Sequence, residues 1–126
     1  MKSEVTKSRR EFLKKSAVAL ATFTIVPRAV LGGTGYLAPS DQLTKAIIGV
    51  GGMGRGHIPY GGTKVVAICD LDKNHLNQAA NIISGGVKTF ADYRELIQLP
   101  EVDIVHIATP PHWHGIMAAE AAKAGK

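Results

Sequence analysis

The sequence predicts an α/β protein built on a doubly wound parallel sheet that is incomplete, with about four strands. Two observations predict this fold class. Short runs rich in β-branched residues alternate with segments of helical periodicity, the pattern of parallel sheets with right-handed crossovers. The first run is followed at once by a glycine-rich stretch. The composition agrees, because 45% hydrophobic and 20% charged residues are typical of a globular domain.

Each element follows from its local pattern. We expect strands over 46–50, 64–70, 87–90 and 103–109. The last strand is nearly continuous in apolar residues, which predicts burial on both faces. We expect helices from the glycine-rich stretch, over 72–83, from Asp92 to Pro100, and over 114–123. Asp92 can cap its helix, and Ser84-Gly85-Gly86 stops the helix before it.

The N-terminal segment has the features of an export signal. Residues 8–14 read SRREFLK and precede an apolar stretch, Ala17–Val26. The paired Arg9 and Arg10 with the following Phe and Leu resemble a twin-arginine (Tat) signal. The alternative is an amphipathic basic helix that stays in the cytoplasm. The apolar stretch is about half the roughly 20 residues that span a bilayer, so no stable membrane span is expected.

The resulting domain prediction is simple. Residues 1–40 form a twin-arginine export signal and linker, and residues 41–126 form the folded part. The expected location is periplasmic, or otherwise exported by the Tat pathway, with the Tat machinery as a partner. Residues 1–28 hold seven of the 15 Lys and Arg but only two of the ten Asp and Glu, so they carry the whole net charge of +5. The rest is neutral and predicts no nucleic-acid partner.

The glycine-rich stretch predicts a dinucleotide site. Residues 49–54 read GVGGMG, a G-x-G-x-x-G pattern between a strand and a helix. Gly49 permits a tight turn, Gly51 lets the backbone approach a pyrophosphate, and Gly54 lets helix and strand pack closely. The phosphates would lie at the helix N-terminus, whose dipole favours negative charge. The candidate cofactor-binding residues of this loop are Gly49, Gly51, Gly52, Met53 and Gly54.

Asp70 completes the pattern. It lies 21 positions after Gly49 at the end of the second expected strand. A carboxylate there accepts hydrogen bonds from adenosine ribose hydroxyls and repels a 2′-phosphate, and Asp72 adds a second negative charge nearby. The expected cofactor is therefore NAD, with NADP disfavoured. The alternative is a glycine-rich turn that binds no dinucleotide, with Asp70 only ending a strand.

With these parts in place, the chain from about Lys45 onward resembles the N-terminal Rossmann domain of the Gfo/Idh/MocA oxidoreductases. Beyond the glycine loop, the resemblance rests on three further motifs. They are Tyr93–Leu96 (YREL), Val102–Val105 (VDIV) and Ala108–His114 (ATPPHWH). The last motif is similar to the family's loop after the fourth strand, which runs beside the cofactor. Ligands of open α/β sheets bind at this edge, so Thr109, Pro110 and His114 are further candidates for contacts to the dinucleotide.

Other residues of chemical interest have plainer interpretations. His112 and His114 are two positions apart and so on different faces of a helix, which argues against a shared metal. No metal site is expected. His106 within its strand is expected to be a packed residue, and Trp113 to pack against the sheet. Cys69, the single cysteine, is expected to be a buried thiol rather than a reactive one.

The resemblance also implies parts that this sequence does not contain. In the family a fifth strand follows, then a Glu-Lys-Pro motif and a substrate domain with the catalytic residues. Lys126 matches the residue before that strand and not the catalytic lysine. We therefore expect a fragment with no catalytic residues of its own, a raw sheet edge and poor stability alone. A homo-oligomer of the full-length protein is left open.

Three functions follow as hypotheses. The leading one is the nucleotide-binding part of an exported oxidoreductase that transfers hydride between a nicotinamide cofactor and a small sugar or polyol-type substrate, held by the missing domain. The second is an exported glycosidase of the same superfamily, which uses bound NAD transiently without net oxidation. The third is a non-catalytic dinucleotide-binding remnant. We expect the full-length protein to be an enzyme.

Overall fold

The computed structural model describes residues 26–35 and 37–126. The chain divides between Ala38 and Pro39 into two units, which are described separately, whereas the sequence placed the boundary at residue 40. Among the described residues of the first unit is a short helix, α2 (Arg28–Leu31). The twin-arginine motif and most of the apolar stretch, residues 17–25, lie outside the described residues. No helix in the described part has the length and apolar character that crossing a bilayer requires.

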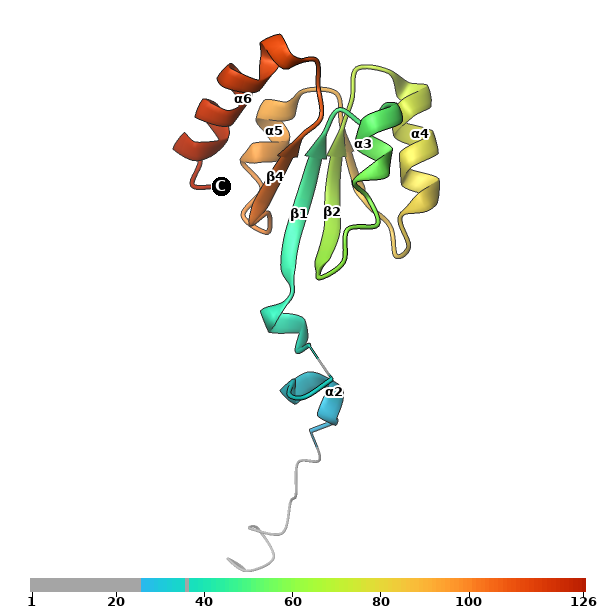
Figure 1. Ribbon diagram of the computed structural model, residues 1–126, viewed down its shortest axis with the longest axis vertical. Helices are drawn as coiled ribbons and strands as arrows, with labels where there is room; N and C mark the ends of the chain where they lie inside the picture. The colour runs from blue at the N-terminus through green and yellow to red at the C-terminus, as the bar shows by residue number, and fades with distance from the viewer. Residues whose placement is uncertain (1–25, 36) are drawn as a thin grey trace, which may run out of the picture. The chain divides into compact units, whose positions relative to one another are not determined.

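The second unit is a four-stranded, all-parallel sheet with the strand order β3-β2-β1-β4. Figure 1 shows the strands alternating with helices along the chain. The elements are η1 (Pro39–Asp41), β1 (Leu43–Ile48), α3 (Gly52–Gly56), β2 (Thr63–Cys69), α4 (Lys73–Ile82), β3 (Lys88–Phe90), α5 (Tyr93–Ile97), β4 (Ile104–Ile107) and α6 (Pro111–Lys123). This topology confirms the predicted Rossmann-type α/β fold with four strands.

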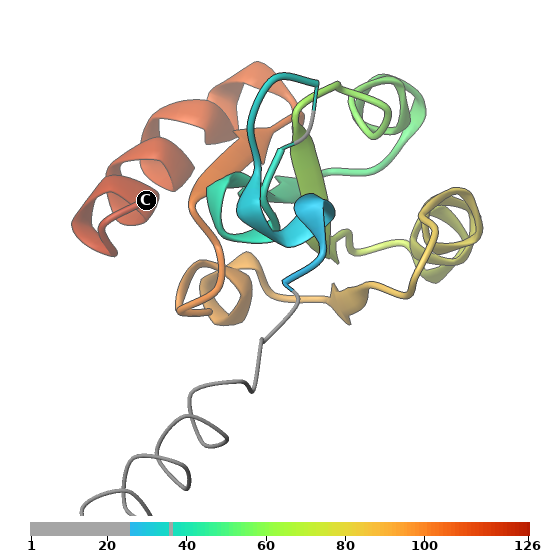
Figure 2. The same cartoon turned by 90° about the horizontal axis from the view of Figure 1, so that it is seen from below.

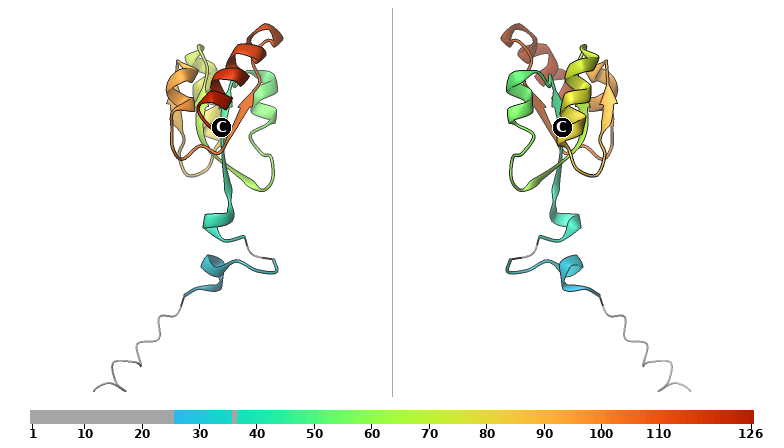
Figure 3. Two further views of the ribbon diagram at one scale, coloured as in Figure 1. Left: turned by 90° about the vertical axis from the view of Figure 1, so that its left-hand side faces the viewer. Right: turned by 90° about the vertical axis from the view of Figure 1, so that its right-hand side faces the viewer.

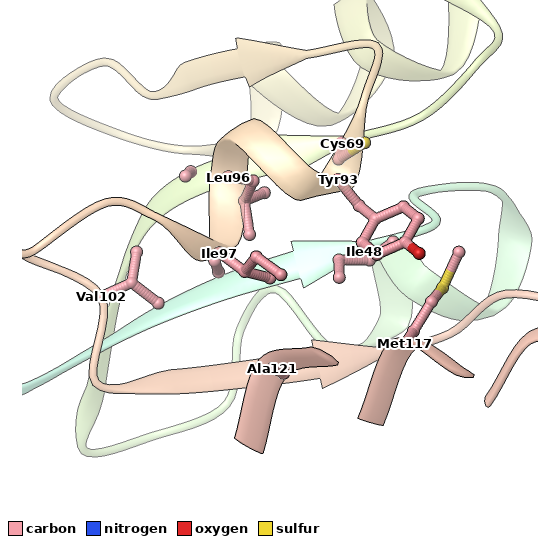
Figure 4. Packing of buried hydrophobic residues seen from close by; sticks show 10 residues of the cluster. Ile48, Cys69, Tyr93, Leu96, Ile97, Val102, Met117 and Ala121 are labelled. Carbon is pink, nitrogen blue, oxygen red and sulfur yellow. The ribbon is translucent and has the colours of Figure 1, made fainter. Parts of the chain in front are cut away.

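The helices form a layer on each face of the sheet. α3 and α4 lie on one side and α5 and α6 on the other, as Figures 2 and 3 show. Successive side chains of β1 point to opposite faces of the sheet and so contribute to two hydrophobic cores. Ile47 packs in the core toward α4, and Ile48 packs in the core toward α5 and α6. Figure 4 shows the second of these cores, in which Tyr93, Leu96 and Ile97 of α5 lie over the sheet. Leu96 is fully buried there.

The predicted cap at Asp92 is present, and Asp72 is a second cap that the sequence analysis did not predict. The Asp72 side chain accepts a hydrogen bond from the Asn74 amide (2.7 Å) and begins α4. The Asp92 side chain accepts one from the Arg94 amide (2.9 Å) and begins α5. Carboxylates at this position satisfy amides that the first helical turn leaves unpaired.

Several boundaries differ from those expected, and two of them bear on the site. β1 ends at Ile48 rather than at residue 50, because the chain turns at Gly49, whose φ of 86° no strand residue adopts. α6 begins at Pro111 rather than at His114. Proline is well suited to the first helical position, because its fixed φ is helical and its missing N–H would have no helical partner there. The prolines therefore start the helix, and the histidines that follow are helical.

The expected burial of the fourth strand on both faces is wrong for the described part of the chain. There, β4 pairs only with β1 and forms an edge of the sheet. Ile104 is 36% exposed and the other residues of β4 are half-buried. A continuous apolar run indicates that both faces of a strand could be buried. How far they are buried depends on the strands and helices that pack beside the strand.

Basic side chains meet beside this edge. His106 on β4 stacks against His57, with ring centroids 4.1 Å apart. Lys45 of β1 is 3% exposed, and its Nζ donates a hydrogen bond to the His57 carbonyl (2.7 Å). Burial, with the charges of His57 and Lys45 as lesser causes, holds the pKa of His106 below its ordinary value. The folded protein therefore resists protonation of His106.

This arrangement predicts acid sensitivity. The unfolded chain takes up a proton on His106 at higher pH than the folded chain does, so the free energy of unfolding falls as the pH drops below about 6.5. The replacement His106→Leu should weaken this pH dependence, and His112→Gln, at an exposed position on α6, should not. Urea unfolding at pH 7.5 and pH 5.5 measures both. Equal pH dependence in wild type and His106→Leu would contradict the prediction.

Candidate functional site

The glycine loop lies where the ends of two adjacent strands meet. Gly49 follows β1 with a φ of 86°, and a Cβ atom there would lie 3.0 Å from the backbone of Ala108 and Thr109. The Gly49 amide donates to the Cys69 carbonyl (2.8 Å), which ties the turn to β2. Position 49 therefore requires glycine for its backbone angle and for the close passage of the chain after β4.

The last glycine of the motif has a packing role. A Cβ atom at Gly54 would lie 1.8 Å from the Gly49 carbonyl oxygen, which is inside any permitted contact distance. The loop can therefore close against α3 only without a side chain at position 54. Gly51 faces the His75 ring, with 3.7 Å between its ideal Cβ position and His75 Cε1, and Gly52 faces open space.

Asp70 holds the loop from the opposite side. Its Oδ2 atom accepts a hydrogen bond from the Val50 amide (2.9 Å), and its Oδ1 atom accepts one from the Asp72 amide (2.9 Å). Both carboxylate oxygens are thus fixed by backbone donors, one in the glycine loop and one at the start of α4. The side chain is 15% exposed. Asp70 therefore orients the glycine loop in addition to presenting negative charge at its rim.

These residues border a cavity of about 730 Å³ at the carboxyl ends of the strands. This volume is within the usual range for pockets that hold small molecules and cofactors. The lining residues come from the glycine loop, the end of β2, the first turns of α4 and α5, and the β4–α6 connection. They are Ile48, Gly49, Gly51, Cys69, Asp70, Leu71, His75, Ala91, Asp92, Tyr93, Arg94, Glu95, Ala108, Thr109, Pro110, Trp113 and Met117.

The wall opposite the glycine loop is held by a polar contact between two helices. The Tyr93 hydroxyl donates a hydrogen bond to Glu120 of α6 (2.6 Å). This bond and then burial raise the pKa of Tyr93, so its phenol stays neutral. The Arg94 guanidinium lies over the Tyr93 ring (4.7 Å) and 3.6 Å from the Glu120 carboxylate. α5 and α6 are joined at the cavity by this group.

The predicted binding residues divide into two groups. Five of them line the cavity: Gly49, Gly51, Asp70, Thr109 and Pro110. Four do not: Gly52, Met53, Gly54 and His114. In this second group, Gly54 packs against the loop and Met53 is 79% exposed. His114 Nε2 lies 2.6 Å from the Thr109 carbonyl oxygen, so it fixes the β4–α6 connection that borders the cavity.

Sequence reasoning missed several lining residues. His75 and Arg94 stand in the first turns of α4 and α5, three and two positions after the capping Asp72 and Asp92. Those caps are the signal that could have placed them at this edge of the sheet. Trp113 was expected against the sheet, but it is 42% exposed and lines the cavity. It does so because α6 begins at Pro111, which places Trp113 in the first helical turn.

Two other chemistries find no support here. Within residues 26–35 and 37–126, no three His, Cys, Asp or Glu side chains gather as a metal ion would require. Cys69 borders the cavity, but burial, followed by the charges of Asp70, Asp92 and Glu95, raises the pKa of its thiol to about 12. A thiol that stays protonated is a poor nucleophile, which agrees with its expected inert role.

The geometry fits a dinucleotide. The glycine positions leave loop backbone open to the cavity, and the fixed Asp70 carboxylate can accept hydrogen bonds from ribose hydroxyls. The expected contribution of a helix dipole is smaller than the sequence suggested, because α3 has only five residues. Phosphate recognition would depend on the amides of the loop itself. The fold and the site together define the class, a nucleotide-binding Rossmann domain.

The comparisons with known proteins give the family. Residues 43–126 match the family described as "Oxidoreductase family, NAD-binding Rossmann fold" (GFO_IDH_MocA). The chain belongs to the Gfo/Idh/MocA oxidoreductase family, and this part of it is the NAD-binding domain. A curated relative from Shewanella sp. (strain ANA-3), "Glycosyl hydrolase family 109 protein 2", is 38% identical over an alignment that covers 94% of this chain and 32% of the relative.

Solved structures of inositol dehydrogenases share the fold. The myo-inositol 2-dehydrogenase of Lactobacillus plantarum is 35% identical with a TM-score of 0.60, over 66% of this chain and 26% of that one. The myo-inositol dehydrogenase of Lactobacillus casei, in complex with NAD(H) and myo-inositol, is 28% identical with a TM-score of 0.60, over 64% and 25%. This chain thus spans about a third or less of the length of these relatives.

The packing of the glycine loop yields a matched pair of variants. Gly54→Ala places a methyl group against the Gly49 carbonyl, so the loop must shift and the protein should lose about 3 kcal/mol or more of unfolding free energy. Gly56→Ala, in the same helix with nothing within 4 Å, should be neutral or stabilising. Urea unfolding and titration with NADH measure both effects. A Gly54→Ala variant as stable as Gly56→Ala would refute this account of the loop.

Proposed function

We propose that this chain is the dinucleotide-binding part of an exported, NAD-dependent oxidoreductase that transfers hydride between the nicotinamide and a sugar or polyol-type substrate. The observation that carries this proposal is the Asp70 carboxylate, which lines the cavity and is fixed beside the glycine loop. The likeness to myo-inositol dehydrogenases supports the substrate class, because inositol is a polyol.

The residues of this chain bind and orient the cofactor. The glycine loop offers backbone amides to the pyrophosphate, and Asp70 accepts hydrogen bonds from the adenosine ribose. Thr109 and Pro110 border the cavity from the β4–α6 connection, which the His114 ring contact holds in place. When bound, the dinucleotide supplies the hydride acceptor or donor. No residue of this chain is assigned a catalytic role.

NAD is preferred over NADP for an electrostatic reason. Asp70 and Asp72 both lie where the adenosine ribose is expected, and a 2′-phosphate would approach two carboxylates. Arg94, the basic side chain on the far wall, already lies near the carboxylates of Asp92 and Glu120. The Arg94 guanidinium is therefore already paired with carboxylates, so it offers little compensation for the charge of a 2′-phosphate.

A second function remains in view because of the curated relatives. They include proteins described as glycosyl hydrolase family 109 proteins, two of them 38% identical to this chain. Both classes share the dinucleotide-binding domain, so the features of this chain fit either reaction. The difference is whether the reaction leaves the cofactor reduced at its end. We favour the oxidoreductase because the family description and the similar structures are oxidoreductases.

Product analysis separates the two reactions. The gene should be read past the codon for Lys126 and the complete protein assayed with NAD and a panel of polyols and glycosides. The proposal predicts that NADH accumulates in proportion to oxidised polyol, and that Gly54→Ala abolishes the reaction. Release of sugar with no net NADH would instead establish the glycosidase. A stop codon directly after Lys126 would leave dinucleotide binding as the function of the product.

We also propose export through the Tat pathway, based on Arg9 and Arg10 in their SRREFLK context. Proteins that fold around a cofactor before export fit this pathway, because the exterior supplies no dinucleotide. Replacing both arginines by lysine keeps the charge but should block export. Fractionation of expressing bacterial cells should then find the double variant in the cytoplasm. The control, Lys2→Arg with Lys7→Arg, should be exported as the wild type is, and equal export of all three would contradict the proposal.

A further inference from the structure

His75 occupies a position that the sequence motifs do not assign. It stands in the first turn of α4 and lines the same cavity as Gly51 and Asp70. Its Nδ1 atom lies 3.4 Å from Asp70 Oδ2, and its Nε2 atom lies 3.9 Å from Asp72 Oδ2. The ring also lies beside the glycine loop, with Cε1 3.7 Å from the ideal Cβ position of Gly51. The imidazole thus lies beside Asp70, Asp72 and the glycine loop, where the adenosine ribose is expected.

We propose that His75 is a specificity-determining residue of the dinucleotide site, in which the charge on its imidazole sets how strongly the site rejects a 2′-phosphate. This inference rests on the proposed function, because it places the adenosine ribose beside Asp70. It goes further by assigning the discrimination between NAD and NADP to a third residue, one that can change its charge.

The charged side chains around His75 explain why the charge on its imidazole affects the binding of a 2′-phosphate. Asp70 faces it from the end of β2, and Asp72 faces it from the N-cap of α4. Across the loop, Arg55 of α3 contacts Gln78 of α4 rather than either carboxylate. Asp92, Arg94 and Glu95 line the cavity from α5. Within the described residues, His75 and Arg94 are therefore the basic side chains of the cavity lining, and His75 is the one beside Asp70.

A neutral imidazole carries a single N–H group, so it can donate to only one of the two carboxylates. An imidazolium carries two and can face both. Protonation of His75 therefore adds one positive charge between Asp70 and Asp72 and reduces the local negative charge from two to one. A 2′-phosphate gains from that change far more than a ribose hydroxyl does. Histidines change charge between about pH 5 and pH 8, so the rejection of NADP should weaken toward acid pH.

His75 has no strong structural duty that would mask this effect. α4 is capped by Asp72, and it packs on the sheet through apolar residues that include Ala79. The His75 side chain is 41% exposed. Replacing it by another polar residue should therefore leave the fold intact, and its contacts with carboxylates point toward the site.

The experiment measures binding of NADH and NADPH to the 126-residue chain at pH 8 and pH 6. Trp113 is the single tryptophan and lines the cavity, so energy transfer from it to the reduced nicotinamide reports binding directly. The quantity compared is the ratio of the two dissociation constants, Kd for NADPH over Kd for NADH. The proteins are wild type, His75→Gln, His75→Arg and the control His112→Gln, at a histidine outside the cavity lining.

We expect the ratio to fall on acidification in wild type and in His112→Gln by about fivefold more than in His75→Gln, the factor for one unit charge about 4 Å away in water. The comparison is needed because the 2′-phosphate itself titrates near pH 6 in every sample. His75→Arg should give a low ratio at both pH values. Urea unfolding of each variant checks that the fold is kept.

The outcomes are distinct. Equal pH dependence of the ratio in wild type and His75→Gln would overturn the proposal, as would an unchanged ratio in a folded His75→Arg. A parallel loss of NADH and NADPH affinity in His75→Gln would show that the histidine only positions Asp70, which also overturns it. Failure of wild type to bind NADH, when urea unfolding shows that it is folded, would instead refute the proposed function.

Discussion

The rest of the structure depends on a backbone crossing that only glycine permits. The Gly49 carbonyl lies where a Cβ atom of Gly54 would be, and the backbone after β4 passes 3.0 Å from the Cβ position of Gly49. β1, α3 and the β4–α6 connection therefore meet at one point without intervening side chains. Because this point is at the carboxyl end of the sheet, the same packing that joins the elements also leaves loop backbone facing the cavity. Fold and binding site share a single constraint.

The position of the Asp70 carboxylate depends on the same packing of the glycine loop. A carboxylate at a strand end could point in many directions, but here two backbone amides fix both of its oxygens. One of these amides belongs to the glycine loop, so the group that would read the ribose also holds the loop that would bind the phosphates. Removing the charge would therefore disturb both functions. His75, which approaches Asp70 without contributing a cap or a core contact, is a position where charge can change while that framework stays.

The sequence predicts this architecture well where one local rule decides the outcome. The G-x-G-x-x-G motif, the capping Asp92 and the strand–helix alternation are local, and each is found as expected. Prediction fails where distant neighbours decide. The apolar run of β4 does not show that β4 lies at a sheet edge, and Lys45 carries no sign that it is 3% exposed. His75 has a place in the site only once the end of β2 and the start of α4 are folded against the glycine loop.

The shared domain also explains why this chain alone does not decide between the two reactions of its relatives. Inositol dehydrogenases and glycosyl hydrolase family 109 proteins both align with it, over about a third or less of their own lengths. Its cavity is shaped by the glycine loop, Asp70 and the β4–α6 connection, to which we assign the dinucleotide rather than a substrate. Net oxidation or hydrolysis must then depend on the groups that hold the substrate against the nicotinamide. Substitutions in this domain should accordingly change which dinucleotide binds, and how tightly, before they change which reaction follows.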